Sequence, residues 1–98
     1  MGVKDAVVKM IVGKNGERWK CSPIDDTGFN RVCERVMKDG EGQEVATGSM
    51  FEVFANPETC AATFGTTSLK DDEWEDAAEI ASKVTGGCKV TKRGYTSG

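Results

Sequence analysis

Residues 6–12 are predicted to form a β-strand, which would place Val8, Met10 and Val12 on one face and Val7, Lys9 and Ile11 on the other. Asn15-Gly16 follows, and this pair favours a two-residue hairpin turn because both of its positions need positive φ angles. Such a turn places Val12 opposite Trp19 on one face of the hairpin. We therefore predict an N-terminal hairpin arm that extends to about Cys21.

The following segment has the spacing of an α-helix. Ser22-Pro23-Ile24-Asp25 is typical of a helix start, because serine can cap the first turn and proline suits the first helical position. Thr27 is the alternative cap. Apolar residues then recur three and four positions apart, on one helical face: Phe29, Val32, Cys33, Val36 and Met37. Gly40 is expected to end this helix.

Four further elements are predicted after Gly40. One strand is predicted over residues 43–54, with a bulge near Gly48-Ser49. Another strand is predicted over residues 60–66. A capping box at Ser68-Leu69-Lys70-Asp71 opens a second helix. Its apolar stripe comprises Trp74, Ala77, Ala78, Ala81 and Val84. Residues 88–93 are expected to form a last strand.

The predicted order is β-α-β-β-α-β, with the hairpin arm as a possible addition at the N-terminus. This order is the split βαβ, or ferredoxin-like, plan of α+β sandwich domains. Right-handed crossovers would put both helices on one face of an antiparallel sheet with the strand order 4-1-3-2. The 98 residues are expected to form a single small domain, residues 1–98.

Charge and composition limit the classes of partner that this chain is expected to bind. The net charge is −3 and the isoelectric point is near 4.9, so the chain has no excess of basic residues with which to bind nucleic acid. No run approaches the roughly 20 apolar residues of a transmembrane segment. Met1-Gly2 is typical of a start added to a mature protein whose signal peptide has been removed. We expect a secreted monomer with an unknown protein or cell-envelope target.

Four cysteines in a short chain that contains no histidine are the strongest signal. An even number of scattered cysteines is typical of two disulfides in a secreted protein. In the split βαβ plan, Cys21 and Cys88 lie at the same end of the domain. Cys33 lies on the buried face of the first helix, over the strand that carries Cys60. We therefore predict the pairs Cys21–Cys88 and Cys33–Cys60.

Other roles for the cysteines stay open. Cys33 on an apolar helix face would make an ordinary buried thiol, and all four cysteines could be free in a cytosolic protein. A zinc site is disfavoured because the cysteine ligands of such sites usually come in closely spaced pairs. A catalytic cysteine is disfavoured because the chain has no histidine to act as its base.

Charged clusters offer further candidates for chemistry. The acidic run in residues 71–79 could bind calcium, but acids in the first turns of a helix also interact favourably with the helix dipole. Asp25-Asp26 could form an acid–base pair, although capping explains both residues. Arg18-Trp19-Lys20 mixes basic and aromatic residues, as a nucleic-acid or lipid contact would, but Trp19 is expected to be half-buried. We assign no catalytic, cofactor-binding or metal-binding residue and no cofactor, and we expect a protein that is not an enzyme.

With two internal bridges on a β-α-β-β-α-β chain, the sequence resembles the virally encoded killer toxins of smut fungi and the secreted effectors of plant-pathogenic fungi that share their fold. The resemblance covers residues 6–93 and rests on element order and on Cys21, Cys33, Cys60 and Cys88. It implies a virulence protein that binds a competing microbe's envelope or a plant host. The alternative is an intracellular ferredoxin-like regulatory or inhibitor module with free thiols.

Overall fold

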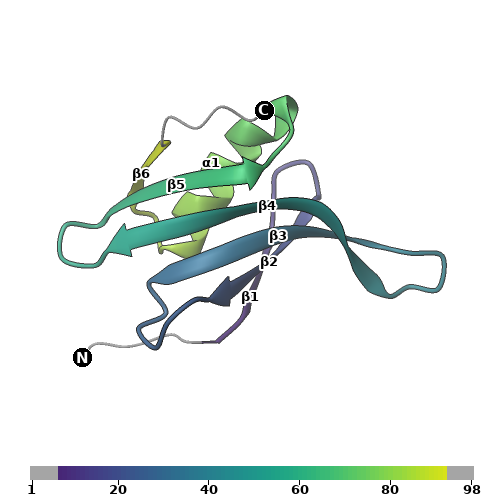
Figure 1. Cartoon of the computed structure of the whole chain (residues 1–98), viewed down its shortest axis with the longest axis horizontal. Helices are drawn as coiled ribbons and strands as arrows, with labels where there is room; N and C mark the ends of the chain where they lie inside the picture. The colour runs from purple at the N-terminus through teal and green to yellow at the C-terminus, as the bar shows by residue number, and fades with distance from the viewer. Residues whose placement is uncertain (1–6, 93–98) are drawn as a thin grey trace.

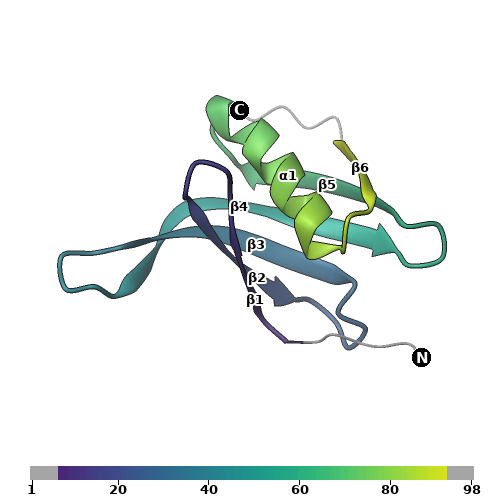
Figure 2. The same ribbon diagram turned by 180° about the vertical axis from the view of Figure 1, so that it is seen from behind.

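The computed structural model describes residues 7–92, which form a curled six-stranded sheet with one helical segment on one face (Figure 1). The strands are β1 (Lys9–Val12), β2 (Arg18–Pro23), β3 (Asn30–Lys38), β4 (Glu44–Asn56), β5 (Ala61–Ser68) and β6 (Lys89–Lys92). A short 3-10 helix, η1 (Asp71–Glu73), leads into the α-helix α1 (Trp74–Val84). Figure 2, seen from behind, shows α1 lying across the sheet face that is hidden in Figure 1.

The prediction of a ferredoxin-like sandwich is wrong. The strands follow their sequence order across the sheet, β1-β2-β3-β4-β5-β6, and one α-helix rather than two covers it in the described part of the chain. Neighbouring strands up to β5 are antiparallel hairpin partners. β5 and β6 are parallel, because α1 carries the chain back along the sheet between them.

The segment predicted as the first helix is instead a turn followed by β3. Asp25 Oδ1 accepts hydrogen bonds from the Thr27 hydroxyl at 2.7 Å and the Thr27 N–H at 3.2 Å, and Asp25 Oδ2 accepts one from the Asn30 amide at 2.8 Å. These bonds lower the pKa of Asp25, and the bond from the Thr27 hydroxyl has the largest effect. Asp25 therefore stabilises a loop between two antiparallel strands, and it neither caps a helix nor forms an acid–base pair.

The predicted N-terminal hairpin is confirmed, but its register differs by one residue. The Gly16 N–H donates to the Gly13 carbonyl at 3.0 Å, and Gly16 has a φ of +84°, so the loop has three residues rather than two. Val12 therefore pairs with Arg18, and Ile11 pairs with Trp19. A one-residue slip exchanges the two faces of a strand, so Ile11 packs inward and Val12 is exposed.

The core fills the space between the sheet and α1. The sheet, the helix and the connection between β5 and η1 contribute these buried side chains: Trp19, Cys21, Cys33, Phe51, Val53, Ala62, Phe64, Leu69, Ala77, Ile80, Ala81 and Val84. The predicted apolar stripe of the second helix is confirmed by Ala77, Ala81 and Val84, which are buried. Trp19 is fully buried, so the mixed Arg18-Trp19-Lys20 segment cannot present its aromatic ring to a nucleic acid or lipid.

Two disulfides are confirmed, but the predicted pairs Cys21–Cys88 and Cys33–Cys60 are wrong. Cys21 is bonded to Cys33, and Cys60 is bonded to Cys88. Cys21 and Cys33 are directly opposite each other in β2 and β3, with Cα atoms 3.9 Å apart. Cys60 and Cys88 immediately precede the parallel strands β5 and β6, and their Cα atoms are 4.8 Å apart. The observed pairs follow from the strand order that replaces the ferredoxin-like plan.

The hairpin of β3 and β4 extends beyond the other strands. β2 pairs with β3 only as far as Val36, and β5 pairs with β4 only from Met50 onward. Residues 37–49, called the arm below, therefore project from one end of the sheet (Figure 1). The predicted bulge near Gly48-Ser49 is confirmed. Glu34 of β3 pairs with Met50, whereas Val36, two residues later, pairs with Ala46, four residues earlier in β4. Gly48, between these two pairs, has a φ of +99°.

Candidate functional site

An open cleft of about 730 Å³ lies where the arm leaves the sheet. Its walls come from the β1–β2 turn, the base of the arm and the start of α1. Four basic side chains line it: Arg18, Arg35, Lys38 and Lys70. Four acidic side chains line it as well: Glu17, Asp72, Glu73 and Asp76. The cleft is therefore a mosaic of both charges.

Glu73 connects the walls of this cleft. It is only 3% exposed, and its Oε2 accepts a hydrogen bond from Arg35 Nη1 at 2.8 Å. Its Oε1 accepts bonds from the Ser49 hydroxyl at 2.7 Å and from the Lys70 N–H at 2.9 Å. Arg35 belongs to β3, Ser49 to β4, and Lys70 precedes η1. One carboxylate thus fixes the base of the arm to the start of the helix.

The environment of Glu73 favours its charged form. Burial raises the pKa of Glu73, but the bonds from the Lys70 N–H, the Ser49 hydroxyl and Arg35, together with the Arg35 charge, outweigh burial. The pKa of Glu73 therefore lies below its usual value of 4.5. At neutral pH the cleft keeps a buried, fully bonded ion pair with the half-exposed Arg35.

The pKa of a second acidic group, Asp76, is shifted in the opposite direction. Burial raises the pKa of Asp76, and the neighbouring Glu17 carboxylate raises it further, whereas Lys14 opposes the effect. Glu17 Oε1 accepts a hydrogen bond from the Asn15 N–H at 3.1 Å, while its Oε2 is buried without a hydrogen-bond partner. A Cβ at Gly13 would collide with this carboxylate, so the glycine leaves the space that Glu17 occupies.

The adjacent carboxyls of Glu17 and Asp76 do not form the arrangement of a glycosidase. Such enzymes need two carboxyl groups that face each other across the scissile bond with space between them. Here the two carboxyls are neighbours, and the Glu17 carboxylate raises the pKa of Asp76. In the described part of the chain all cysteines are disulfide-bonded, so no thiol is available as a nucleophile.

The acidic run of residues 71–79 contributes three side chains to the cleft, Asp72, Glu73 and Asp76. Within residues 7–92 no group of three acidic or sulfur ligands is placed to hold a metal ion, so the calcium alternative gains no support. Arg35 and Ser49 were not singled out from the sequence. Their only signal is the predicted bulge beside Ser49, which points to an interruption of the sheet rather than to a partner for Glu73.

A second cleft of about 290 Å³ lies beside the Cys60–Cys88 disulfide, at the other end of the sheet. Arg31 lines it but is only 2% exposed, and its Nη1 donates to the carbonyl of Val7 at 2.7 Å. Arg31 therefore fixes the segment before β1 and presents little of its charge to a ligand.

Comparisons with known proteins do not place the chain in a family. No protein-family model matches it, and searches of the curated proteins and of the solved structures return no match. Within residues 7–92 no helix is long and apolar enough to cross a membrane. The function must therefore be argued from the cleft, the arm and the disulfides.

Replacing Glu73 by glutamine should lower stability at neutral pH and flatten its acid dependence. Because the pKa of Glu73 is lowered in the fold, its contribution is present above pH 4.5 and is lost as the pH falls through the folded pKa. We expect Glu73→Gln to cost about 1–3 kcal/mol at pH 7, since Arg35 and Ser49 lose a charged acceptor. Urea unfolding measured between pH 3 and pH 7 would test this.

Asp76→Asn should change the pH dependence of stability in the opposite direction from Glu73→Gln. The pKa of Asp76 is raised above its usual 3.8, so ionisation of Asp76 lowers stability as the pH rises through the folded pKa. The variant removes that loss, and at pH 7 it should be at least as stable as the parent protein. Identical pH profiles for the two variants would contradict the roles assigned to these carboxyls.

Proposed function

We propose that this chain is an extracellular binding protein that holds its target in the cleft at the base of the arm. The observation that carries the proposal is the Glu73 network. A buried carboxylate with three hydrogen bonds joins two of the three walls, the base of the arm and the start of the helix, before any ligand arrives. A preformed site binds at a lower cost in conformational entropy, which suits recognition.

The lining favours a polar target. The cleft combines four basic and four acidic side chains, and no aromatic side chain of the described residues lines it. A surface of this kind suits the mixed charges of a protein or peptide better than the faces of sugar rings, which stack on aromatic side chains. The adjacent Glu17 and Asp76 carboxyls and the bonded cysteines give no support to catalysis.

Two disulfides support an extracellular location, because such bonds persist in oxidising compartments. The intracellular alternative assumed free thiols, and the two bonded pairs do not support that assumption. A toxin or effector role remains a hypothesis. The element order on which that resemblance rested is not the order of this sheet, and four cysteines alone do not distinguish a toxin from other secreted binding proteins.

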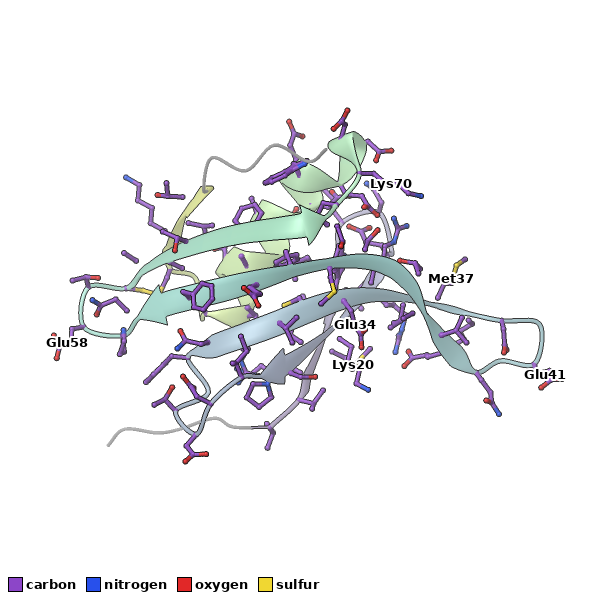
Figure 3. The ribbon with its side chains drawn as sticks, in the orientation of Figure 1. Lys20, Glu34, Met37, Glu41, Glu58 and Lys70 are labelled. Atoms are coloured by element: carbon purple, nitrogen blue, oxygen red, sulfur yellow. A yellow bond between two sulfur atoms is a disulfide. The ribbon has the colours of Figure 1, made fainter. Side chains whose placement is uncertain are left out.

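The test compares two charge reversals at exposed acids. Asp72→Lys changes the cleft, and Glu58→Lys makes the same change in the β4–β5 loop, at the opposite end of the sheet (Figure 3). Each immobilised variant is incubated with extracellular extracts, and bound proteins are quantified by mass spectrometry. We expect a protein retained by the parent chain and by Glu58→Lys but lost with Asp72→Lys. If the two variants retain the same proteins equally, the cleft is not the binding site.

A further inference from the structure

The arm presents a free strand edge. Within the described chain, residues 44–46 of β4 pair with β3 on one side, and β5 pairs with β4 only from Met50 onward, so residues 44–46 have no strand on their other side. At the turn of the arm the Asp39 N–H donates to the Gln43 carbonyl at 2.9 Å. Because inward and outward groups alternate along an antiparallel strand, Glu44 and Ala46 direct their N–H and C=O groups away from β3. An edge of this kind is a template for another strand.

An exposed apolar pair lies beside this edge. Met37 and Val45 are directly opposite each other in β3 and β4, and they are 57% and 43% exposed. Figure 3 shows the Met37 side chain standing clear of the ribbon near the base of the arm. Cross-strand apolar pairs stabilise a sheet when further side chains continue the row. The arm therefore offers both a backbone edge and an apolar row that ends at Val45.

We propose that two copies of this chain form a symmetric dimer by antiparallel pairing of their β4 edges, centred on Val45. In this register Val45 lies opposite Val45 of the second copy, and Glu44 lies opposite Ala46 of the second copy. Met37 and Val45 of both copies then form one apolar row across four strands. Arg18 neutralises Glu44 within each copy, at 2.7 Å, so no uncompensated like charges face each other across the edge.

The charges at the two ends of the new ladder are complementary. Glu41 lies in the turn at the tip of the arm, and antiparallel pairing directs this tip toward the base of the second copy's arm, where Ser49 lies. Lys70 lies next to Ser49, because the Lys70 N–H and the Ser49 hydroxyl donate to the same oxygen of Glu73, at 2.9 and 2.7 Å. Both Glu41 and Lys70 are exposed (Figure 3). The symmetry thus brings an exposed acid of each copy to an exposed base of the other.

This dimer departs from the monomer expected from the sequence, and the unpaired edge of the arm is the reason. The inference goes beyond the proposed function. Met37, Ser49 and Lys70 line the cleft and also lie in or beside the dimer contact, so the two proposals are separated at other residues. Val45 does not line the cleft, whereas Asp72 does. Variants of Val45 therefore test the dimer and variants of Asp72 test the binding cleft, so either proposal can be contradicted without the other.

Sedimentation equilibrium of the full chain, from about 10 µM to about 1 mM, tests the dimer. We expect the average mass to rise towards twice the 10.5 kDa of the chain. Val45→Lys should abolish this rise, because it places two ammonium groups at the centre of the contact. Val12→Lys is the matched control, since Val12 is 49% exposed on β1 and lies outside the proposed contact. That variant should dimerise as the parent chain does.

A cross-linking measurement keeps the proposal testable if the lysine variant unfolds. Val45 residues that are opposite each other across an antiparallel edge bring their Cα atoms within disulfide range, about 4.4–6.8 Å. Val45→Cys should therefore give a covalent dimer under mild oxidation, faster than Val12→Cys at the same concentration. A parent chain that stays monomeric up to about 1 mM, or equal cross-linking of the two cysteine variants, would overturn the proposal.

Discussion

Replacing Phe51 by alanine should lower the free energy of unfolding by about 3–5 kcal/mol. Phe51 is 1% exposed and lies between Trp19 and Phe64, with ring centroids 5.2 and 5.5 Å away. Phe64 in turn contacts Trp74 of α1, at 5.8 Å. The substitution opens a cavity in the row of rings that joins the sheet to the helix. A loss of this size is a large share of the roughly 5–15 kcal/mol that stabilises a small domain.

Phe54→Ala is the matched control for this prediction. Phe54 is in the same strand, but it is 44% exposed on the outer face. Its truncation removes little buried surface and should cost less than about 1 kcal/mol. Urea unfolding of both variants gives the comparison. Equal losses for Phe51→Ala and Phe54→Ala would contradict the assignment of inner and outer faces in β4.

Removing the Cys60–Cys88 disulfide should cost about 3.6 kcal/mol, the loop-closure entropy of 28 residues. The effect should be concentrated in β6, which has four residues and pairs only with β5 in the described sheet. The double variant Cys60→Ala/Cys88→Ala keeps both side chains small and leaves no free thiol at this site. Hydrogen exchange should then be faster in β6 than in β3.

The other disulfide supplies the control. Cys21–Cys33 closes a loop of 12 residues, for which the same entropy is about 2.8 kcal/mol. Cys21→Ala/Cys33→Ala should leave the protection of β6 close to that of the parent chain and lower the protection of β2 and β3. If both double variants lower protection in the same strands, the two disulfides do not act on separate parts of the sheet.

Signals that lie within one continuous segment predicted the local elements well. The Asn15-Gly16 hairpin, β4 with its bulge, β5 and the apolar stripe of α1 were all identified from the sequence. Each depends on period, turn chemistry or capping over a few residues. The capping box was displaced by two residues, because Glu73 rather than Asp71 bonds back to the N–H at the start of the turn, which is that of Lys70.

The error in β3 has a specific cause. Phe29, Val32 and Val36 have helical spacing, but a strand with apolar residues on both faces produces the same spacing. The decisive contact is Cys33 with Cys21, and it lies in a neighbouring strand rather than in the segment itself. The predicted disulfides were derived from the predicted topology. The wrong assignment of β3 as a helix therefore also made the predicted cysteine pairs wrong.

The candidate site could not be predicted from the sequence, for a similar reason. Glu73 and Asp76 belong to an acidic run that the sequence shows clearly, and the dipole of a helix explains acids at its start. What makes Glu73 unusual is Arg35 and Ser49, which come from the base of the arm. Residues so distant in sequence meet only once the strand order is known, so composition and spacing gave no sign of the cleft.

The cleft and the arm are built by hairpin-connected strands that are joined by the disulfides Cys21–Cys33 and Cys60–Cys88. Tryptic mapping without reduction tests this arrangement directly, because trypsin places the four cysteines on separate peptides, 21–31, 32–35, 39–70 and 84–89. The fold predicts two linked pairs, 21–31 with 32–35 and 39–70 with 84–89. Recovery of 21–31 linked to 84–89, or of 32–35 linked to 39–70, would contradict it.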